Sequence, residues 1–237
     1  MSIEENVERV QKEIAQAAIA AGRQPEEVVL CAATKMNDAQ AVRRAIAAGV
    51  GVCGENRVQE LTQKLGENAY EGAQIHFIGH LQTNKVKLVV GKVDLIQSVD
   101  SLRLLEAVSK EAQRLGVLQD ILLEVNIGGE SAKTGFSPEE VLPLMDKIDS
   151  FSNVRVKGLM AIPPIARFPG DNLKFFQKMR EIYVDIRAKK NDNVPVDCLS
   201  MGMSGDFGDA IAAGSTMVRI GTAIFGKRVY DTVHQKM

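Results

Sequence analysis

Residues 217–226 read Met-Val-Arg-Ile-Gly-Thr-Ala-Ile-Phe-Gly, an apolar run that carries one arginine and, shortly after it, a Gly-Thr pair. A continuous run rich in Val and Ile predicts a strand that is buried on both faces, as in a parallel sheet. Alternation along such a strand would place Arg219, Gly221 and Ala223 on one face. Because its neighbours there are small, the arginine would have room for an anionic or acceptor-rich ligand. An ion pair with a buried carboxylate explains the arginine alone equally well.

The rest of the chain alternates short β-branched runs with longer amphipathic stretches, which is typical of α/β proteins. The expected strands cover residues 28–34, 50–54, 74–79, 95–99, 119–127, 154–162, 196–203 and 217–225. Helices are expected at residues 3–21, 38–48, 57–65, 85–90, 101–115, 137–151, 173–189 and 207–213. Eight such repeats without a break in composition predict a (β/α)8 barrel of the TIM type with an extra amino-terminal helix. An open, doubly wound sheet is the alternative.

We expect a single domain over residues 1–237, with the barrel at about residues 26–228 and a short carboxy-terminal tail. The sequence shows no linker, low-complexity segment or change of composition that would mark a second domain. Three cysteines, Cys31, Cys53 and Cys198, lie in apolar, strand-like stretches without Cys-x-x-Cys spacing. They are expected to be buried thiols, and no metal site is expected.

Composition and charge favour small-molecule chemistry. The chain is 45% hydrophobic and 25% charged, and its 29 basic and 30 acidic residues give a net charge of −1. A nearly neutral globular chain argues against nucleic acid or a membrane surface as partner. The polar start of the sequence is unlike a signal peptide, and no apolar run approaches the roughly 18 residues of a membrane span. We therefore expect a cytoplasmic protein.

A TIM-type barrel carries its functional residues at the carboxyl ends of its strands and commonly holds phosphate after strands seven and eight. Polar and small residues of this sequence fall at those places. The candidate ligand-binding residues are Lys35 after the first strand, Asn56 after the second, Ser200 and Ser204 at the seventh, and Arg219, Gly221 and Thr222 at the eighth. Hydroxyls and the backbone N–H groups of glycines suit a phosphate group.

Lys35 would end the first strand on the face that it shares with Val29, Cys31 and Ala33. Burial among these small and apolar neighbours would lower the lysine pKa and supply a free amine for a Schiff base. A snorkelling or ion-paired lysine is the alternative. A reactive lysine, a phosphate site and an arginine suited to a ring nitrogen together describe a site for pyridoxal phosphate. A Schiff-base aldolase without a cofactor would leave Arg219 unexplained.

Six ordered motifs make the chain resemble the pyridoxal phosphate homeostasis proteins, single-domain relatives of the alanine racemase barrel. These motifs are residues 33–35 (Ala-Thr-Lys), 52–60, 76–85, 157–162, 199–204 and 218–226. The resemblance implies that Lys35 carries pyridoxal phosphate as an internal aldimine and that Arg219 faces the pyridine nitrogen. It further implies that Ser204, Gly221 and Thr222 hold the phosphate and that Asn56 lies beside the ring.

The sequence departs from this family at Asn37, where many members have a second lysine two residues after the Schiff-base lysine. Any role of that second lysine as a transient cofactor acceptor is therefore not expected here. Lys133 matches a family lysine near the barrel mouth, although a solvated loop lysine is the alternative interpretation.

Two functions from different classes compete. The first is a monomeric carrier and buffer of pyridoxal phosphate without catalytic residues, whose partners would be apoenzymes that need the cofactor. The second is an amino-acid racemase of the alanine racemase type. A racemase needs a second proton-transfer base, and Tyr70, Tyr183 and Tyr230 all lie outside the motifs. The related racemases complete their site with a second domain and a partner subunit, which favours the carrier.

Overall fold

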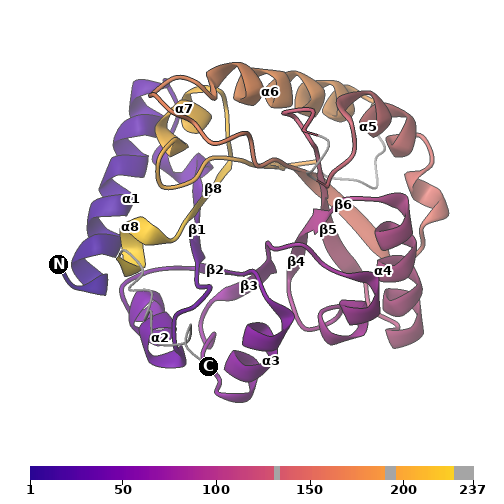
Figure 1. The fold of residues 1–237 in the computed structure, drawn as a ribbon, viewed down its shortest axis with the longest axis horizontal. Coiled ribbons are helices and arrows are strands. Elements are labelled where there is room, and N and C mark those ends of the chain that lie inside the picture. The colour runs from indigo at the N-terminus through magenta and orange to yellow at the C-terminus, as the bar shows by residue number, and fades with distance from the viewer. Residues whose placement is uncertain (131–133, 190–195, 227–237) are drawn as a thin grey trace, which may run out of the picture.

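The computed structural model describes residues 1–130, 134–189 and 196–226. Eight parallel strands close into a barrel in chain order, and β8 pairs back onto β1 (Figure 1). The strands are β1 (Val29–Ala33), β2 (Val52–Glu55), β3 (Gln74–Phe77), β4 (Leu95–Val99), β5 (Gln119–Glu124), β6 (Val154–Met160), β7 (Cys198–Ser200) and β8 (Met217–Ile220). The prediction of a (β/α)8 barrel is therefore confirmed.

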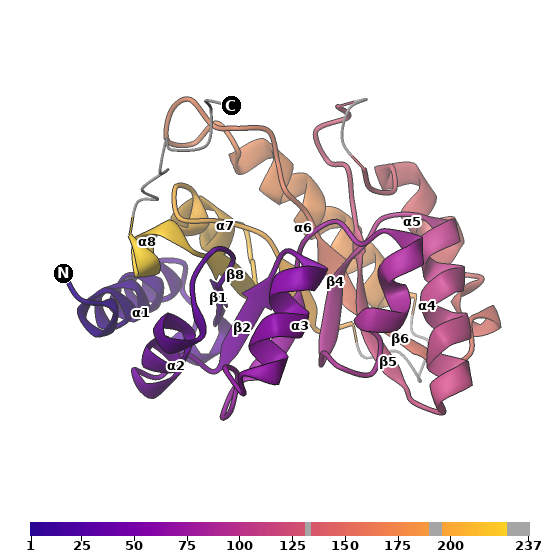
Figure 2. The same ribbon diagram turned by 60° about the horizontal axis from the view of Figure 1, so that its bottom comes forward.

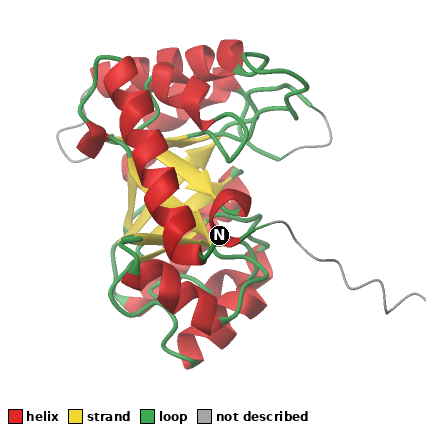
Figure 3. Cartoon of the chain, turned by 90° about the vertical axis from the view of Figure 1, so that its left-hand side faces the viewer, coloured by secondary structure: helices red, strands yellow, loops and turns green. Residues whose placement is uncertain are grey.

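Helices surround the strands on the outside of the barrel (Figure 3). They are α1 (Ile3–Ala20), α2 (Ala39–Ala47), α3 (Val58–Gly66), α4 (Leu102–Leu115), α5 (Pro138–Met145), α6 (Leu173–Ala188), α7 (Phe207–Ala212) and α8 (Thr222–Phe225). Short 3₁₀ helices occur at η1 (Pro25–Glu27), η2 (Thr83–Leu88) and η3 (Ile148–Ser150). Figure 2 shows α3 lying beside β2 and α4 beside β5 and β6. Among the described residues, no helix is long and apolar enough to cross a bilayer.

The extra amino-terminal helix α1 supports the last turn of the barrel. It begins at a capping box in which Ser2 and Glu5 satisfy each other's backbone N–H groups. The apolar stripe of α1 is buried, and polar side chains at the edge of this stripe contact the segment directly after β8. Asn6 Nδ2 donates to the carbonyl of Ile224 at 2.9 Å, and Arg9 Nη2 donates to that of Ala223 at 2.8 Å. The helix thus anchors α8, which borders the mouth of the barrel.

Several expected elements differ from the structure; the strand expected at residues 196–203, for example, is shortened to β7, and the one expected at 119–127 ends with β5 at Glu124. The strand expected at residues 217–225 is wrong beyond Ile220, because the chain turns at Gly221 and forms the short helix α8. The carbonyl of Gly221 accepts from the N–H groups of Ile224 and Phe225, so these groups cannot continue the sheet ladder. The helix expected at 85–90 is the 3₁₀ helix η2, and α5 stops at Met145 rather than 151. The expected tail lies, apart from Gly226, outside the described residues.

Side chains inside the barrel form a cluster of their own. This interior cluster consists of Cys31, Ala33, Val52, Ile78, Leu95, Leu122, Met160, Cys198 and Met217. The opposite face of each strand packs against the surrounding helices and makes the larger core. Cys31, Cys53 and Cys198 are free and buried, as expected, and burial raises the pKa of each thiol.

Gly158 lets β6 and β7 approach closely. Its φ is +151°, and a Cβ at this position would collide with the carbonyl of Cys198 on β7. Because the obstacle is backbone rather than a flexible side chain, it cannot move without breaking the pairing of Gly158 with Cys198.

We predict that Gly158→Ala lowers the free energy of unfolding by on the order of 3 kcal/mol, since strain and strand separation add. Urea unfolding followed by circular dichroism measures this. Gly51→Ala is the matched control, because a Cβ at Gly51 meets no atom within 4 Å. Equal unfolding midpoints for the two variants would contradict the close approach described here.

Candidate functional site

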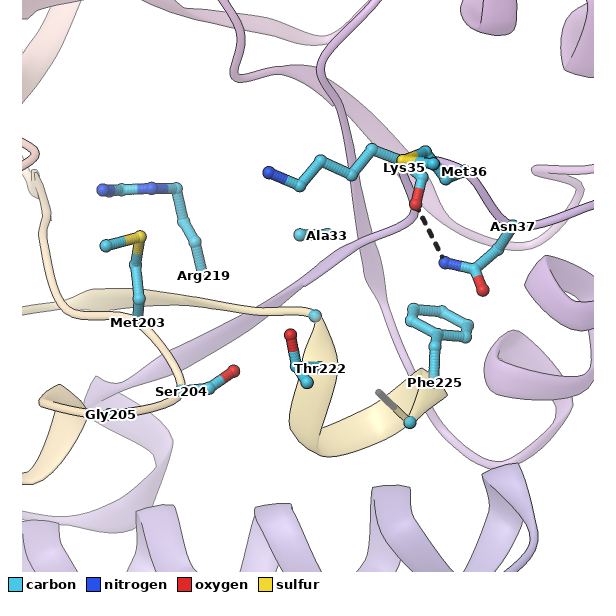
Figure 4. Close-up of a pocket in the computed structure, with 12 residues that line it drawn as sticks. Ala33, Lys35, Met36, Asn37, Met203, Ser204, Gly205, Arg219, Thr222 and Phe225 are labelled. Atoms are coloured by element: carbon cyan, nitrogen blue, oxygen red, sulfur yellow. Dashed lines mark hydrogen bonds between the residues drawn. The ribbon is translucent and has the colours of Figure 1, made fainter. Parts of the chain in front are cut away.

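A cavity of about 430 Å³ opens at the carboxyl ends of β1 and β8 (Figure 4). The chain segments that follow β1, β7 and β8 form its walls, so residues from both ends of the sequence meet there. The lining residues are Ala33, Lys35, Met36, Asn37, Met203, Ser204, Gly205, Arg219, Gly221, Thr222, Phe225 and Gly226. This is the place in a TIM-type barrel at which ligands are expected.

Lys35 enters the cavity from the turn directly after β1, and its side chain extends toward Arg219 (Figure 4). Contacts with α3 hold the turn on both sides of the lysine. Lys64 Nζ donates to the carbonyl of Thr34 at 2.8 Å, and the N–H of Met36 donates to Glu60 Oε2 at 2.6 Å. Met36 has a φ of +61°, which a non-glycine residue adopts only where its surroundings enforce it. The turn is therefore fixed in one conformation.

A buried ion pair lies beneath this turn. Glu55 at the end of β2 is fully buried, and its Oε2 accepts from Lys64 Nζ at 2.6 Å. The same oxygen accepts from the hydroxyls of Thr34 at 3.1 Å and Tyr70 at 3.2 Å. Sequence reasoning missed Lys64, although a lysine on the apolar stripe of a helix was a usable signal. A charge on that stripe needs a buried partner, and Glu55 at the neighbouring strand end is that partner.

Arg219 lies inside the barrel and is 4% exposed. Its guanidinium donates from Nη1 to Ser200 Oγ at 2.6 Å and from Nη2 to the carbonyl of Ala161 at 2.9 Å. Burial lowers the pKa of this guanidinium. Its hydrogen-bond partners here are a hydroxyl and a carbonyl rather than the carboxylate that the alternative interpretation required. Since Arg219 also lines the cavity, its charge is available to a ligand with an acceptor atom.

Ser204 and Thr222 form one end of the cavity, where the residues suit a phosphate group. Their hydroxyls lie on facing sides of the cavity, and each neighbours a glycine, Gly205 and Gly221 (Figure 4). The loop that carries Ser204 is held by Asp206, whose Oδ1 accepts from the N–H of Met203 at 2.7 Å. Hydroxyl donors and exposed backbone beside small residues suit an anionic oxygen cluster. Thr222 shares this cavity with Arg219 because the chain turns at Gly221.

Two predicted site residues lie elsewhere. Ser200 is fully buried, is not part of the cavity lining and bonds to the guanidinium of Arg219 instead, so its contact with a cofactor stays a prediction. Asn56 is also absent from that lining, and its backbone packs against Gly79, two residues beyond the end of β3. The Asn56 Oδ1 atom is buried and has no hydrogen-bond partner among the described residues. Lys133 lies outside the described residues.

Glu124 is a titratable group that sequence reasoning missed. It ends β5 on the face that Leu122 presents to the barrel interior. Burial, with a smaller contribution from nearby Asp100, raises the pKa of its carboxyl to about 7, and Arg219 opposes the rise. Asp100 in turn lies 2.9 Å from His80 Nδ1. A strand-end carboxylate was visible in the sequence, but its approach to Arg219 depends on how the barrel closes.

The chain is similar to known proteins over nearly its whole length. The family model described as "Alanine racemase, N-terminal domain" matches residues 2–229. A pyridoxal phosphate homeostasis protein of Aquifex aeolicus is 42% identical over 226 residues, which cover 95% of this chain and 98% of that protein. The protein of the same name from Escherichia coli K12 is 38% identical over 233 residues, which cover 97% and 98%.

A solved structure agrees with this relationship. PipY of Synechococcus elongatus, determined with pyridoxal phosphate bound, has a TM-score of 0.77 and 32% sequence identity, over 90% of this chain and 100% of that one. The family model's match to residues 2–229 includes the segments that form the cavity. On the strength of these full-length similarities, the chain belongs to the family of pyridoxal phosphate homeostasis proteins, within the alanine racemase N-terminal domain group.

Proposed function

We propose that this chain is a cytoplasmic, monomeric carrier that binds pyridoxal phosphate at the mouth of its barrel and releases it without turning over amino acids. The observation that carries the proposal is the cavity in which one amine, one guanidinium and two hydroxyls converge. Its residues fit the cofactor in chemistry, since the cofactor presents an aldehyde, a ring nitrogen and a phosphate. The family supports the same assignment.

Lys35 is proposed to supply the amine that condenses with the cofactor aldehyde. The carbon–nitrogen double bond forms with loss of one water molecule, and addition of water reverses it, so neither step needs a further reactant. The fixed turn around Lys35 aims its side chain before the ligand arrives, which reduces the entropy lost on binding. A reversible bond suits a protein that both retains and releases a reactive aldehyde.

Arg219 is proposed to face the pyridine nitrogen. A guanidinium has donors and no acceptor, and it keeps its proton at neutral pH, so it donates to the ring nitrogen and leaves that nitrogen unprotonated. When bound, pyridoxal phosphate supplies an electron sink for chemistry at an amino-acid α-carbon. An unprotonated nitrogen weakens that sink. Arg219 thus favours retention of the cofactor over turnover.

The racemase alternative needs a second base. Neither Tyr70 nor Tyr183 lines the cavity. The Tyr70 hydroxyl donates to buried Glu55, and the Tyr183 hydroxyl donates to the carbonyl of Val196. Tyr230 lies outside the described residues. Glu124 is the group that would favour this alternative, because its pKa is raised to about 7 in the barrel interior. The predictions below separate the two functions.

Borohydride should fix pyridoxal phosphate covalently to Lys35. Reduction of the carbon–nitrogen bond makes it permanent, and peptide mapping by mass spectrometry then locates the label. We expect Lys35→Ala to lose the label and Lys85→Ala to keep it. A label on Lys85, with none on Lys35, would refute the assignment.

Loss of either hydroxyl should weaken cofactor binding. A hydrogen bond to a charged group contributes about 1.5–3 kcal/mol, so Ser204→Ala and Thr222→Val should each raise the Kd for pyridoxal phosphate about tenfold or more. Equilibrium titration of the apo-protein measures the change. Thr62→Val makes the same chemical change on α3, where the hydroxyl bonds to the carbonyl of Val58, and should leave the Kd unaltered. If all three variants bind equally well, phosphate is held elsewhere.

Incubation of the holo-protein with L-alanine in deuterated water tests for turnover. A missing base costs about 10²–10⁴-fold in rate, so we expect α-deuteration far slower than in a dedicated racemase. In a parallel assay, the holo-protein should reactivate an apoenzyme that depends on pyridoxal phosphate. Rapid deuteration with racemised product would instead establish the enzyme, and Glu124→Gln would then show whether this carboxyl acts as the second base.

A further inference from the structure

A continuous chain of hydrogen bonds runs through the barrel interior from the guanidinium of Arg219. Arg219 Nη1 lies 2.6 Å from Ser200 Oγ, and Ser200 Oγ lies 2.7 Å from Gln97 Oε1. Gln97 Nε2 then lies 2.9 Å from His76 Nδ1. The four side chains come from β8, β7, β4 and β3, so strands far apart in the sequence contribute one member each. We call these four residues the interior relay.

The direction of every bond in the interior relay follows from its first member. Arginine can only donate, so Ser200 Oγ accepts from it and directs its own proton to Gln97 Oε1. The amide nitrogen of Gln97 is thereby turned to His76, whose Nδ1 must be the acceptor. A reversed amide would leave the buried Ser200 proton without an acceptor, which is costly. His76 is therefore neutral and carries its proton on Nε2.

The ring environment agrees with this protonation state. Burial lowers the pKa of His76 to about 4, although nearby Asp94 opposes the shift. His76 also lines a second cavity of about 660 Å³ that opens among the amino-terminal ends of the strands, with Asp94, Lys157 and Asp197. The interior relay thus extends from the cofactor cavity at one end of the barrel to a cavity at the other end.

Burying the four polar side chains of the interior relay costs free energy, so their presence in an apolar barrel needs an explanation. Arg219, Ser200, Gln97 and His76 are all at most 4% exposed, and each would lose free energy if it lacked a partner. The surrounding interior cluster is apolar, and a leucine in place of Gln97 would fill the same space without polar atoms. Compared with a leucine, Gln97 adds an acceptor that orients the Ser200 hydroxyl, and this hydroxyl in turn orients the guanidinium of Arg219.

We propose that Gln97 and His76 are positioning residues for the cofactor: acting through Ser200, they hold Arg219 in the orientation in which its guanidinium meets the pyridine ring. The inference rests on the proposed function, because it assumes that the cofactor occupies the cavity that Arg219 lines. It assigns a role to two residues that do not line that cavity. It also gives Ser200 a role at the site, behind the arginine rather than against the cofactor.

A double-mutant cycle tests the coupling. Gln97→Leu should raise the Kd for pyridoxal phosphate about tenfold in the wild-type background but less than about twofold in Arg219→Ala, where no guanidinium remains to be positioned. Leu95→Ala is the control on the same strand, since Leu95 belongs to the interior cluster and not to the relay. It should lower the unfolding midpoint without changing the Kd. An equal change in both backgrounds, or no change in the wild type, overturns the proposal.

His76→Phe provides a second variant in case Gln97→Leu does not fold. It keeps a ring of similar size, removes the Nδ1 acceptor, and should show the same dependence on Arg219. If either variant loosens binding equally with and without Arg219, its effect is structural.

Nitrogen-15 NMR of the apo-protein gives a readout that is independent of the cofactor. His76 should show an unprotonated Nδ1 and a protonated Nε2 at neutral pH. Gln97→Glu retains an acceptor for Ser200 but turns a second oxygen to the ring, and should move the proton to Nδ1. A protonated Nδ1 in the wild type overturns the relay even if pyridoxal phosphate binds, whereas absence of binding with the expected tautomer rejects the proposed function and leaves the relay intact.

Discussion

The buried charge of Arg219 is the constraint on which the site depends. A guanidinium inside a barrel of apolar side chains would be severely destabilising if its donors lacked partners. The structure meets this requirement with the carbonyl of Ala161 and the hydroxyl of Ser200, and the hydroxyl is itself fixed by Gln97 and His76. Because these partners are neutral, the positive charge is not cancelled by direct contact. It therefore remains available at the cavity, where it favours a ligand with an acceptor atom.

The position of Lys35 is fixed in a different way, through hydrogen bonds to the backbone on either side of it rather than to its side chain. The buried pair of Glu55 and Lys64 fixes the carbonyl before the lysine, and Glu60 fixes the N–H after it. The ammonium of Lys64 thus neutralises the buried carboxylate of Glu55 and also positions the turn that carries Lys35. Removal of one partner would leave the other charge buried and unpaired, which generally costs more than the pair contributes. The amine and the guanidinium are consequently presented by two separate polar networks.

The sequence was sufficient for the barrel, because eight β-branched runs with intervening amphipathic stretches allow few other folds. It also predicted that Lys35, Ser204 and Arg219, which lie in motifs at strand ends, meet at one site; they line one cavity, and their contacts with a cofactor stay a prediction. It failed at Gly221, where an apolar run concealed a helical turn whose hydrogen bonds are local. It could not find the contact between Gln97 and Ser200, since these residues are 103 positions apart and meet only across the closed barrel. Strand stagger decides which interior side chains touch, and no local pattern encodes it.

The position of the cavity links ligand binding to closure of the barrel. Lys35 follows the first strand and Arg219 lies on the last, so β1–β8 pairing alone brings the two together. β8 pairs with β1 at four positions, from Val29 with Met217 to Ala32 with Ile220, but with β7 only at Ser200 with Met217. Backbone hydrogen bonds from Met201 to Met217 and from Arg219 to Gly202 continue this contact, and the bond from Arg219 to Ser200 adds a side-chain link between β7 and β8. A ligand held between Lys35 and Arg219 would bind only the closed barrel and would therefore stabilise it. Under the proposed function, release from this mouth would require reversal of the Lys35 bond and loss of the contacts with Ser204, Thr222 and Arg219, while the relay would keep the arginine in place for the next ligand.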